Sequence, residues 1–327
     1  PRAAAVMTVH NLAFQGNFEP DLVAALGLPE SSFAVDGLEF HGRMSFLKAG
    51  LLYADAITTV SPTYAREIQS KTLGFGMDGL LHLRRDSLFG ILNGIDTAVW
   101  NPETDPLIAH NYSASTLDNK LINKQALQQR LQLAQEPEIP LLGVVSRVTQ
   151  QKGIDARVEA ASRLVELPVQ LVALGTGERK LEHALRTVAA RHPRNIAVAI
   201  EYDENLAHLI EAGADMFLMP SRFEPCGLNQ MYSQRYGTPP IARATGGLVD
   251  TIVDCNPGTL RNGSATGFLF NQLTAAELLS AVRRAVAMYR DRSSWRVLQQ
   301  NGMVRYFGWD TAARQYAGIY ARLAGLV

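Results

Sequence analysis

Residues 219–251 read MPSRFEPCGLNQMYSQRYGTPPIARATGGLVDT, and this stretch decides how the second half of the chain folds. It begins at the end of an apolar run, 216–219, that is typical of a buried parallel strand. The polar loop that follows holds Glu224, and a helix is predicted from Gly227 to Tyr236. Open α/β sheets bind ligands at the carboxyl ends of their strands. We therefore expect a ligand site in this loop, where Glu224 and the N–H groups of the helix start can reach one ligand.

Two other loops can contribute to an anion site. A glycine-rich turn, TGG at 245–247, follows the next predicted strand, and backbone N–H groups without a neighbouring Cβ can come close to a diphosphate. Farther upstream, SRVTQQKG at 146–153 supplies Arg147 and Lys152 directly after another predicted strand. Arg offers a planar fork of donors and Lys a point charge, and both suit a diphosphate leaving group. Loop cations are usually solvated, so position alone leaves that alternative open.

Strands and helices alternate regularly in the second half of the chain. Repeated βα units with continuous apolar strands predict a parallel sheet that is covered on both faces. In the first half, 56–60 and 88–92 read as strands, and the polar segment WNPETDP at 100–106 is the best place for a linker or domain edge. Strands are predicted at 141–146, 169–174, 196–202, 216–219 and 240–243, and helices at 117–133, 153–166, 179–191, 204–212, 227–236, 275–289, 294–305 and 310–323.

The composition excludes several classes of protein. With 327 residues, 47% of them apolar, the chain is expected to form about two globular domains. Lys plus Arg and Asp plus Glu both total 31, which argues against binding of nucleic acid or anionic membranes through net charge. No apolar run could span a bilayer, and the first residues resemble neither a signal nor a transit peptide, so a cytoplasmic protein is predicted. Two cysteines, Cys226 and Cys255, are too few for a disulfide framework.

A few further residues are candidates because of where they stand. His10, Asn93 and Tyr202 each lie at the end of a predicted strand, and each has a structural alternative as a packed histidine, a turn residue or a core tyrosine. Cys226 has no histidine nearby in the sequence that would activate a thiol, so a packed side chain is preferred to a nucleophile. No spacing of His, Asp and Glu is typical of a metal site, so we predict a metal-independent protein without a cofactor.

These motifs resemble a known family. The strings SRFEPCGLNQMY, YGTPP and TGGLVDT are similar to the donor-sugar site of bacterial glycogen synthases and plant starch synthases, and the resemblance runs from Thr8 to the C-terminus. It implies a retaining glycosyltransferase of the GT-B type, an α/β fold in which two Rossmann-like domains face each other across a cleft, with ADP-glucose as the donor. The implied parts are 1–96 for the remainder of the N-terminal, acceptor-side domain, 97–306 for the nucleotide-sugar-binding domain, and 307–327 for a C-terminal helix that packs back on the first domain.

The resemblance also implies roles for individual residues. Arg147 and Lys152 hold the ADP phosphates. Glu224 binds hydroxyls of the donor glucose and supports charge in the transition state. The remaining implied site residues are His10 near the bond that breaks, Asn93 near the sugars, Tyr202 on the adenine, and Cys226, Gly227, Leu228, Thr245, Gly246 and Gly247 around the donor.

The sequence departs from the family's pattern at several positions. Many retaining GT-B families have a second Glu eight positions after the first, whereas this chain has Tyr232 there. Glu201 stands in place of a Gly, and Leu209 and Ala244 stand where Arg is expected. The family's first strand carries a Lys-x-Gly-Gly-Leu phosphate loop, and no such string occurs here. We therefore expect that a large N-terminal part lies outside this sequence and that the first domain is incomplete.

The function predicted from residues and resemblance is glucosyl transfer. Glucose would pass from ADP-glucose to the non-reducing 4-hydroxyl of an α-1,4-glucan with retention of configuration, and orientation and stabilisation of the leaving diphosphate would drive catalysis. One alternative is a non-catalytic remnant that binds glucan or nucleotide. Another is a related transferase that uses UDP-glucose. The sequence as it stands is expected to bind ADP weakly and to turn over poorly.

Overall fold

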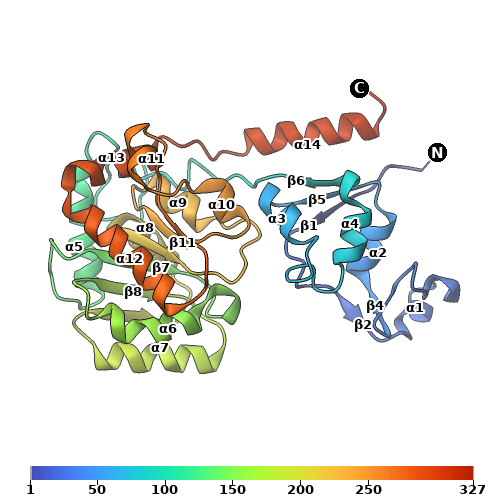
Figure 1. The fold of residues 1–327 in the computed structure, drawn as a ribbon, viewed down its shortest axis with the longest axis horizontal. Helices are drawn as coiled ribbons and strands as arrows, with labels where there is room; N and C mark the ends of the chain where they lie inside the picture. The colour runs from blue at the N-terminus through green and yellow to red at the C-terminus, as the bar shows by residue number, and fades with distance from the viewer. Residues whose placement is uncertain (1, 327) are drawn as a thin grey trace. The chain divides into compact units, whose positions relative to one another are not determined.

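The structure is a computed structural model that describes residues 2–326, without the side chains at positions 157 and 160–162 of one helix. The chain forms two compact units (Figure 1). One comprises Pro1–Asn93 together with Trp309–Val327, and the other comprises Gly94–Gly308. The segment WNPETDP, expected at a domain edge, therefore lies inside the second unit. Each unit has its own parallel sheet and is described by itself.

The Gly94–Gly308 unit is built on a six-stranded sheet in the order β12-β11-β10-β7-β8-β9, and all its paired strands are parallel. The chain builds one half of the sheet outward from β7 and then returns to build the other half from β10. The gap between the loops after β7 and β10 is therefore the switch point at which such sheets bind ligands. The strands are β7 (Leu141–Val145), β8 (Gln170–Leu174), β9 (Ile196–Ala199), β10 (Met216–Met219), β11 (Pro240–Arg243) and β12 (Phe268–Phe270).

Hydrophobic clusters cover both faces of this sheet. Leu142 and Val144 of β7 belong to a cluster that includes residues of α6, α12 and α13, whereas Leu141 belongs to one with α5 and α8. Successive residues of a strand point to opposite faces, so two covered faces require a continuous apolar run. The predicted parallel sheet with helices on both faces is confirmed. The helices are α5 (Lys120–Arg130), α6 (Ile154–Leu164), α7 (Arg179–Arg191), α8 (Glu204–Gly213), α9 (Asn229–Arg235), α10 (Gly247–Thr251), α11 (Pro257–Arg261), α12 (Ala275–Arg290) and α13 (Arg292–Met303).

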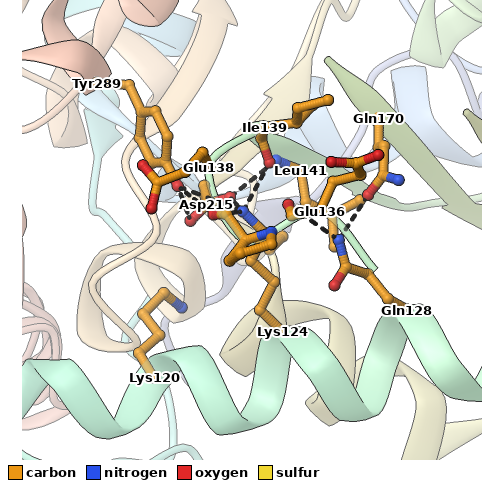
Figure 2. Close-up of polar contacts among 12 residues, drawn as sticks. Lys120, Lys124, Gln128, Glu136, Glu138, Ile139, Leu141, Gln170, Asp215 and Tyr289 are labelled. Atoms are coloured by element: carbon orange, nitrogen blue, oxygen red, sulfur yellow. Dashed lines mark hydrogen bonds and ion pairs between the residues drawn. The ribbon is translucent and has the colours of Figure 1, made fainter. Parts of the chain in front are cut away.

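The polar helix α5 is buried through hydrogen bonds (Figure 2). Lys124 Nζ lies 2.7 Å from a carboxylate oxygen of Asp215 and donates to the carbonyl oxygens of Pro137 at 2.8 Å and Ile139 at 2.6 Å. Asp215 also accepts the N–H of Leu141 at 2.8 Å. Asp215 directly precedes β10 and Leu141 begins β7, so this one ion pair ties the amino ends of two central strands to the helix. Buried polar groups are stable only with such partners.

The other unit contains a three-stranded parallel sheet, β1-β5-β6, and a small antiparallel sheet, β2-β4-β3. Ser61 accepts the N–H of Tyr64 at 3.0 Å as the N-cap of α3. Ala312 and Ile319 of α14 pack in one cluster with Ala56 of β5. Within residues 2–326, every helix is too short or too polar to cross a membrane. The elements are β1 (Val6–Val9), β2 (Asn17–Phe18), β3 (Glu39–Phe40), β4 (Arg43–Ser45), β5 (Ala56–Thr59), β6 (Leu88–Gly90), α1 (Leu22–Ala25), α2 (Phe46–Tyr53), α3 (Pro62–Glu67), α4 (Asp78–Leu83) and α14 (Asp310–Leu323).

Candidate active site

A cavity of about 360 Å³ lies at the carboxyl ends of the central strands of the Gly94–Gly308 unit. Loops after four strands and two helices contribute its walls. This is the position expected from the switch point of the sheet. The residues that line the cavity include Arg147 and Lys152 after β7, Gly175 and Thr176 after β8, Tyr202 and Asp203 after β9, Ser221, Gly227 and Leu228 after β10, Glu211 of α8, Tyr232 of α9, and Trp100.

Lys152 and Glu224 form an ion pair beside the cavity. Lys152 Nζ lies 2.9 Å from Oε1 and 2.7 Å from Oε2 of Glu224, and Ser221 Oγ donates to Oε2 at 2.9 Å. The Glu224 side chain is only 6% exposed. Gly153 makes this approach possible, because its φ is +68° and a Cβ there would lie 1.9 Å from the carbonyl oxygen of Pro220. The loops after β7 and β10 thus touch at a glycine and bring Lys152 onto Glu224.

Arg147 also lines the cavity and stays available for a ligand. Its guanidinium donates one hydrogen bond, to Gln151 at 3.4 Å, and this is the only hydrogen bond that it makes to the residues the structure describes. A guanidinium has five N–H donors. Arg147 and Lys152 therefore place two positive charges on the wall of one cavity, as the loop SRVTQQKG predicts.

The glycine turn at 245–247 packs against the Glu224 loop. A Cβ on Gly246 would lie 1.9 Å from the carbonyl oxygen of Glu224, and one on Gly247 would lie 2.1 Å from that of Cys226. The N–H of Gly247 donates to the carbonyl oxygens of Glu224 at 3.1 Å and Pro225 at 3.2 Å. None of the described residues 245–247 lines the cavity. The two glycines therefore allow a close approach of the Glu224 loop, and the contact of Thr245, Gly246 and Gly247 with a diphosphate stays a prediction.

Two boundary predictions near the site are wrong. Helix α9 begins at Asn229 and not at Gly227, because Gly227 has a φ of +71° and a Cβ there would lie 2.4 Å from the side chain of Gln230. Strand β9 ends at Ala199, so Tyr202 stands in the loop beyond it. The Tyr202 side chain is 87% exposed and donates a hydrogen bond to Glu204 at 2.7 Å. Core packing therefore does not explain this tyrosine, and its ring remains accessible at the edge of the cavity.

Of the other expected donor residues, Leu228 lines the cavity together with Gly227, whereas Cys226 is buried beside it. His10 and Asn93 belong to the other unit. His10 is exposed directly after β1, and Asn93 is half-buried beyond β6. Both therefore stand beyond the carboxyl ends of strands in one parallel sheet. No three His, Cys, Asp or Glu side chains gather as a metal site would require in the described part of the chain.

An aromatic stack forms part of the cavity wall and was not predicted. Trp100 lies face to face with Tyr232, with ring centroids 3.8 Å apart, and with His208 at 3.9 Å. His208 Nδ1 lies 2.7 Å from Asp105 Oδ2, which also accepts the hydroxyl of Tyr236 at 2.6 Å. Burial opposes ionisation of Asp105, but the hydrogen bonds from His208 and Tyr236 outweigh it and lower the pKa of this carboxyl. The sequence does not predict this stack, because its three members lie far apart in the chain.

Comparisons with known proteins agree with this geometry. A family model described as the starch synthase catalytic domain matches residues 1–83, and one described as glycosyl transferases group 1 matches residues 125–298. The chain is 57% identical to a glycogen synthase from Nitrosospira multiformis over 322 residues, which are 98% of this chain and 65% of that protein. It belongs to the glycogen synthase and starch synthase family. A glycogen synthase from Nitrosomonas eutropha is 54% identical over 98% of this chain and 64% of its own length.

Solved structures place the fold within this family. The catalytic domain of starch synthase IV from Arabidopsis thaliana, bound to ADP and acarbose, has a TM-score of 0.93 at 34% identity and covers 99% of this chain and 67% of that one. A sucrose-phosphate synthase from Thermosynechococcus elongatus has a TM-score of 0.59 at 22% identity over 85% of this chain and 61% of its own, which shows the fold alone. The predicted GT-B class is confirmed. The chain spans about two thirds of the length of its relatives.

Proposed function

We propose that this chain carries the donor site of a retaining glucosyltransferase that moves glucose from ADP-glucose to the non-reducing end of an α-1,4-glucan. The names of the relatives and the ADP and acarbose in the starch synthase IV structure support the donor and acceptor classes. The observation that carries the proposal is local. Lys152 and Arg147 line one cavity at the switch point of the sheet, and Glu224 pairs with Lys152 beside that cavity.

In the proposed reaction the bond between glucose C1 and the diphosphate oxygen breaks, and the electron pair leaves with ADP. A new bond forms between C1 and the acceptor O4, whose proton passes to the departing diphosphate. Arg147 and Lys152 neutralise the charge that develops on the diphosphate, and they cost little reorganisation because the fold already holds them on the cavity wall. Glu224 holds the glucose hydroxyls and fixes the distance between the reacting atoms.

Further residues are proposed to recognise the donor. His10 would contact the donor near the breaking bond and Asn93 would lie near the sugars, while the ring of Tyr202 would stack on the adenine. The N–H groups of Cys226, Gly227 and Leu228 would assist Glu224. The proposal needs neither a metal nor a cofactor, since side-chain cations do the work that a divalent ion does elsewhere. We place the protein in the cytoplasm, where nucleotide sugars are made.

Glu224→Gln tests the proposal. The variant keeps the shape of the side chain but removes the charge that pairs with Lys152. Incorporation of labelled glucose from ADP-glucose into glycogen should fall by about 100-fold, as for loss of one preorganised charged group. Glu277→Gln, on an exposed turn of α12, is the matched control and should leave incorporation unchanged. Near-normal incorporation by the Glu224 variant would remove this residue from the site.

The two rival functions are separable in the same assay. If the chain binds ADP in calorimetry but incorporates no glucose under any condition, a nucleotide-binding role is favoured. If labelled UDP-glucose is incorporated faster than labelled ADP-glucose, the donor assignment is wrong while the transferase assignment stands. Equal amounts of both donors in one reaction make this comparison independent of enzyme concentration.

A further inference from the structure

Glu211 lines the candidate donor cavity and has a buried carboxyl oxygen without a hydrogen-bond partner among the described residues. The residue lies on α8, is 1% exposed and lines the cavity. Its Oε2 atom is buried and has no hydrogen-bond partner among the residues that the structure describes. Buried polar atoms are nearly always hydrogen-bonded, because leaving one unpaired loses its hydration without replacing it. An unpaired oxygen on the wall of a ligand cavity therefore indicates a partner that arrives with the ligand.

The nearest cation does not supply that partner. Lys120 Nζ donates to the carbonyl oxygen of Ala212 and the hydroxyl of Thr238, both at 2.7 Å, and lies 3.2 Å from the backbone carbonyl oxygen of Glu211. These bonds hold the ammonium against the backbone and away from the Glu211 carboxyl group. Burial also lowers the pKa of Lys120 to about 7.

The surroundings of Glu211 favour a neutral carboxyl group. Burial raises its pKa well above the ordinary value, and the nearby charge of Lys120 only partly opposes the shift. A protonated carboxyl group has one O–H donor and retains acceptor capacity. Such a group is suited to a hydroxyl of a ligand, which can accept one hydrogen bond and donate another. It is poorly suited to a phosphate, which binds where positive charge is available.

Two aromatic side chains share the cavity wall with Glu211. Trp100 and Tyr232 both line the cavity, and their rings stack with a centroid separation of 3.8 Å. Behind them His208 stacks on Trp100 and is hydrogen-bonded to Asp105, so the indole cannot move without breaking a buried network. A side chain supported in this way presents its polar atoms at a fixed position.

We propose that Glu211 is a donor-recognition residue whose carboxyl group hydrogen-bonds a ribose hydroxyl of the nucleoside diphosphate sugar. The assignment rests on the proposed function, which gives the diphosphate to Arg147 and Lys152, the glucose to Glu224 and the adenine to Tyr202. The ribose is then the one part of the donor without a partner, and it carries two neighbouring hydroxyl groups. Many retaining GT-B families have a second Glu at the position of Tyr232, and this chain instead has a carboxyl group from α8 on the wall of the cavity that Tyr232 lines.

The test compares nucleotide binding by three forms of the chain. Isothermal titration calorimetry measures the affinity of the wild type, Glu211→Met and Glu211→Gln for ADP, 2′-deoxy-ADP and 3′-deoxy-ADP. Glu211→Met keeps the length of the side chain and removes its hydrogen bonds, so ADP should bind about tenfold more weakly. Glu211→Gln can still donate and accept, so it should stay within about threefold of the wild type. Glu277→Met, exposed on α12, is the control and should change nothing.

The deoxy nucleotides show whether the contact is to ribose. At least one of them should bind the wild type about tenfold more weakly than ADP, while Glu211→Met should bind that analogue and ADP equally. The inference is overturned if the wild type binds all three nucleotides alike, a result that does not depend on the folding of any variant. It is also overturned if folded Glu211→Met binds ADP as tightly as the wild type. Absence of ADP binding by the wild type would instead overturn the proposed function, and the inference with it.

Discussion

Two lysine–carboxylate pairs stand at opposite ends of the same two strands. Lys124 and Asp215 meet at the amino ends of β7 and β10, and Lys152 and Glu224 meet beyond their carboxyl ends. The shortest nitrogen-to-oxygen distance is 2.7 Å in both pairs. Distance alone therefore does not distinguish a structural pair from a functional one, and the difference lies in how far each lysine is exposed and in what lines the cavity beside it.

The amino-end pair, Lys124 and Asp215, has its hydrogen-bond partners within the protein. Lys124 is 2% exposed and also donates to two backbone carbonyl groups and to Tyr289, as Figure 2 shows. A cavity of about 320 Å³ borders this pair too, but the other charged groups on its wall are also engaged, with Arg292 paired to Glu138 and Arg296 paired to Asp118. Lys152 is 18% exposed and lines the donor cavity together with Arg147, whose guanidinium makes one hydrogen bond to the described residues. A cavity thus becomes a candidate site when charge on its wall is still available.

Lys124→Met should give the largest effect in this comparison. The change leaves Asp215 and two carbonyl groups buried without their partner, and removal of one member of a buried pair costs about 3–5 kcal/mol. Urea titration followed by circular dichroism measures the loss, with Lys180→Met on the exposed surface of α7 as the control. The double variant with Asp215→Asn should recover part of the loss, because the unpaired charge is gone. A loss of unfolding free energy below about 1 kcal/mol would mean that the amino-end pair stabilises the fold no more than a surface ion pair does.

Lys152→Met should separate binding from stability. The free energy of unfolding should change by less than half as much as in Lys124→Met, because Glu224 keeps its bond from Ser221 and Lys152 is more exposed than Lys124. ADP affinity should fall by about 10-fold to 100-fold, or about 1.4–2.7 kcal/mol, for loss of one charge-assisted contact. Calorimetry at low ionic strength measures it. If stability falls as far as in Lys124→Met while ADP affinity is kept, both pairs are structural and the contrast between them disappears.

The sequence predicts which loops form the candidate site better than it predicts the contacts between those loops. Continuous apolar strands fix the parallel sheet and its switch point, and Arg147 and Lys152 follow from their place after β7. The packing of the turn at 245–247 against the Glu224 loop could not be predicted. A glycine that allows a phosphate to come close and a glycine that allows a backbone carbonyl group to come close look identical in sequence. The start of α9 was predicted wrongly at Gly227 for a related reason. The sequence does not show whether a glycine begins a helix or precedes it in a left-handed backbone conformation.

The buried polar residues were the hardest to predict. Lys124 and Glu211 lie on helices whose sequence shows charges at positions that a surface helix would also have. Their burial depends on carbonyl groups, aromatic rings and carboxylates supplied by distant segments, such as Trp100 for the cavity and Asp215 for α5. Periodicity reports which face is apolar, and it has no means to report that a polar face is covered as well.

Glu211 and Lys120 provide a third case, in which the ammonium group donates to the backbone carbonyl oxygen of Glu211 and not to its carboxyl group, and pH exposes the difference. The folded-state pKa of Glu211 is raised above its unfolded value, so its contribution to stability is full below about pH 4.5 and is lost as the pH rises toward the folded value. Lys120, with a folded pKa of about 7, is largely protonated in both states below about pH 6 and adds little slope there. Between about pH 5 and pH 6 the stability of Glu211→Gln relative to the wild type should therefore rise by up to about 1.4 kcal/mol per pH unit. Urea titrations at several pH values give this slope directly. Parallel pH profiles for the two proteins would show that Glu211 is ionised in the folded state, and that Lys120 neutralises it as Lys124 neutralises Asp215.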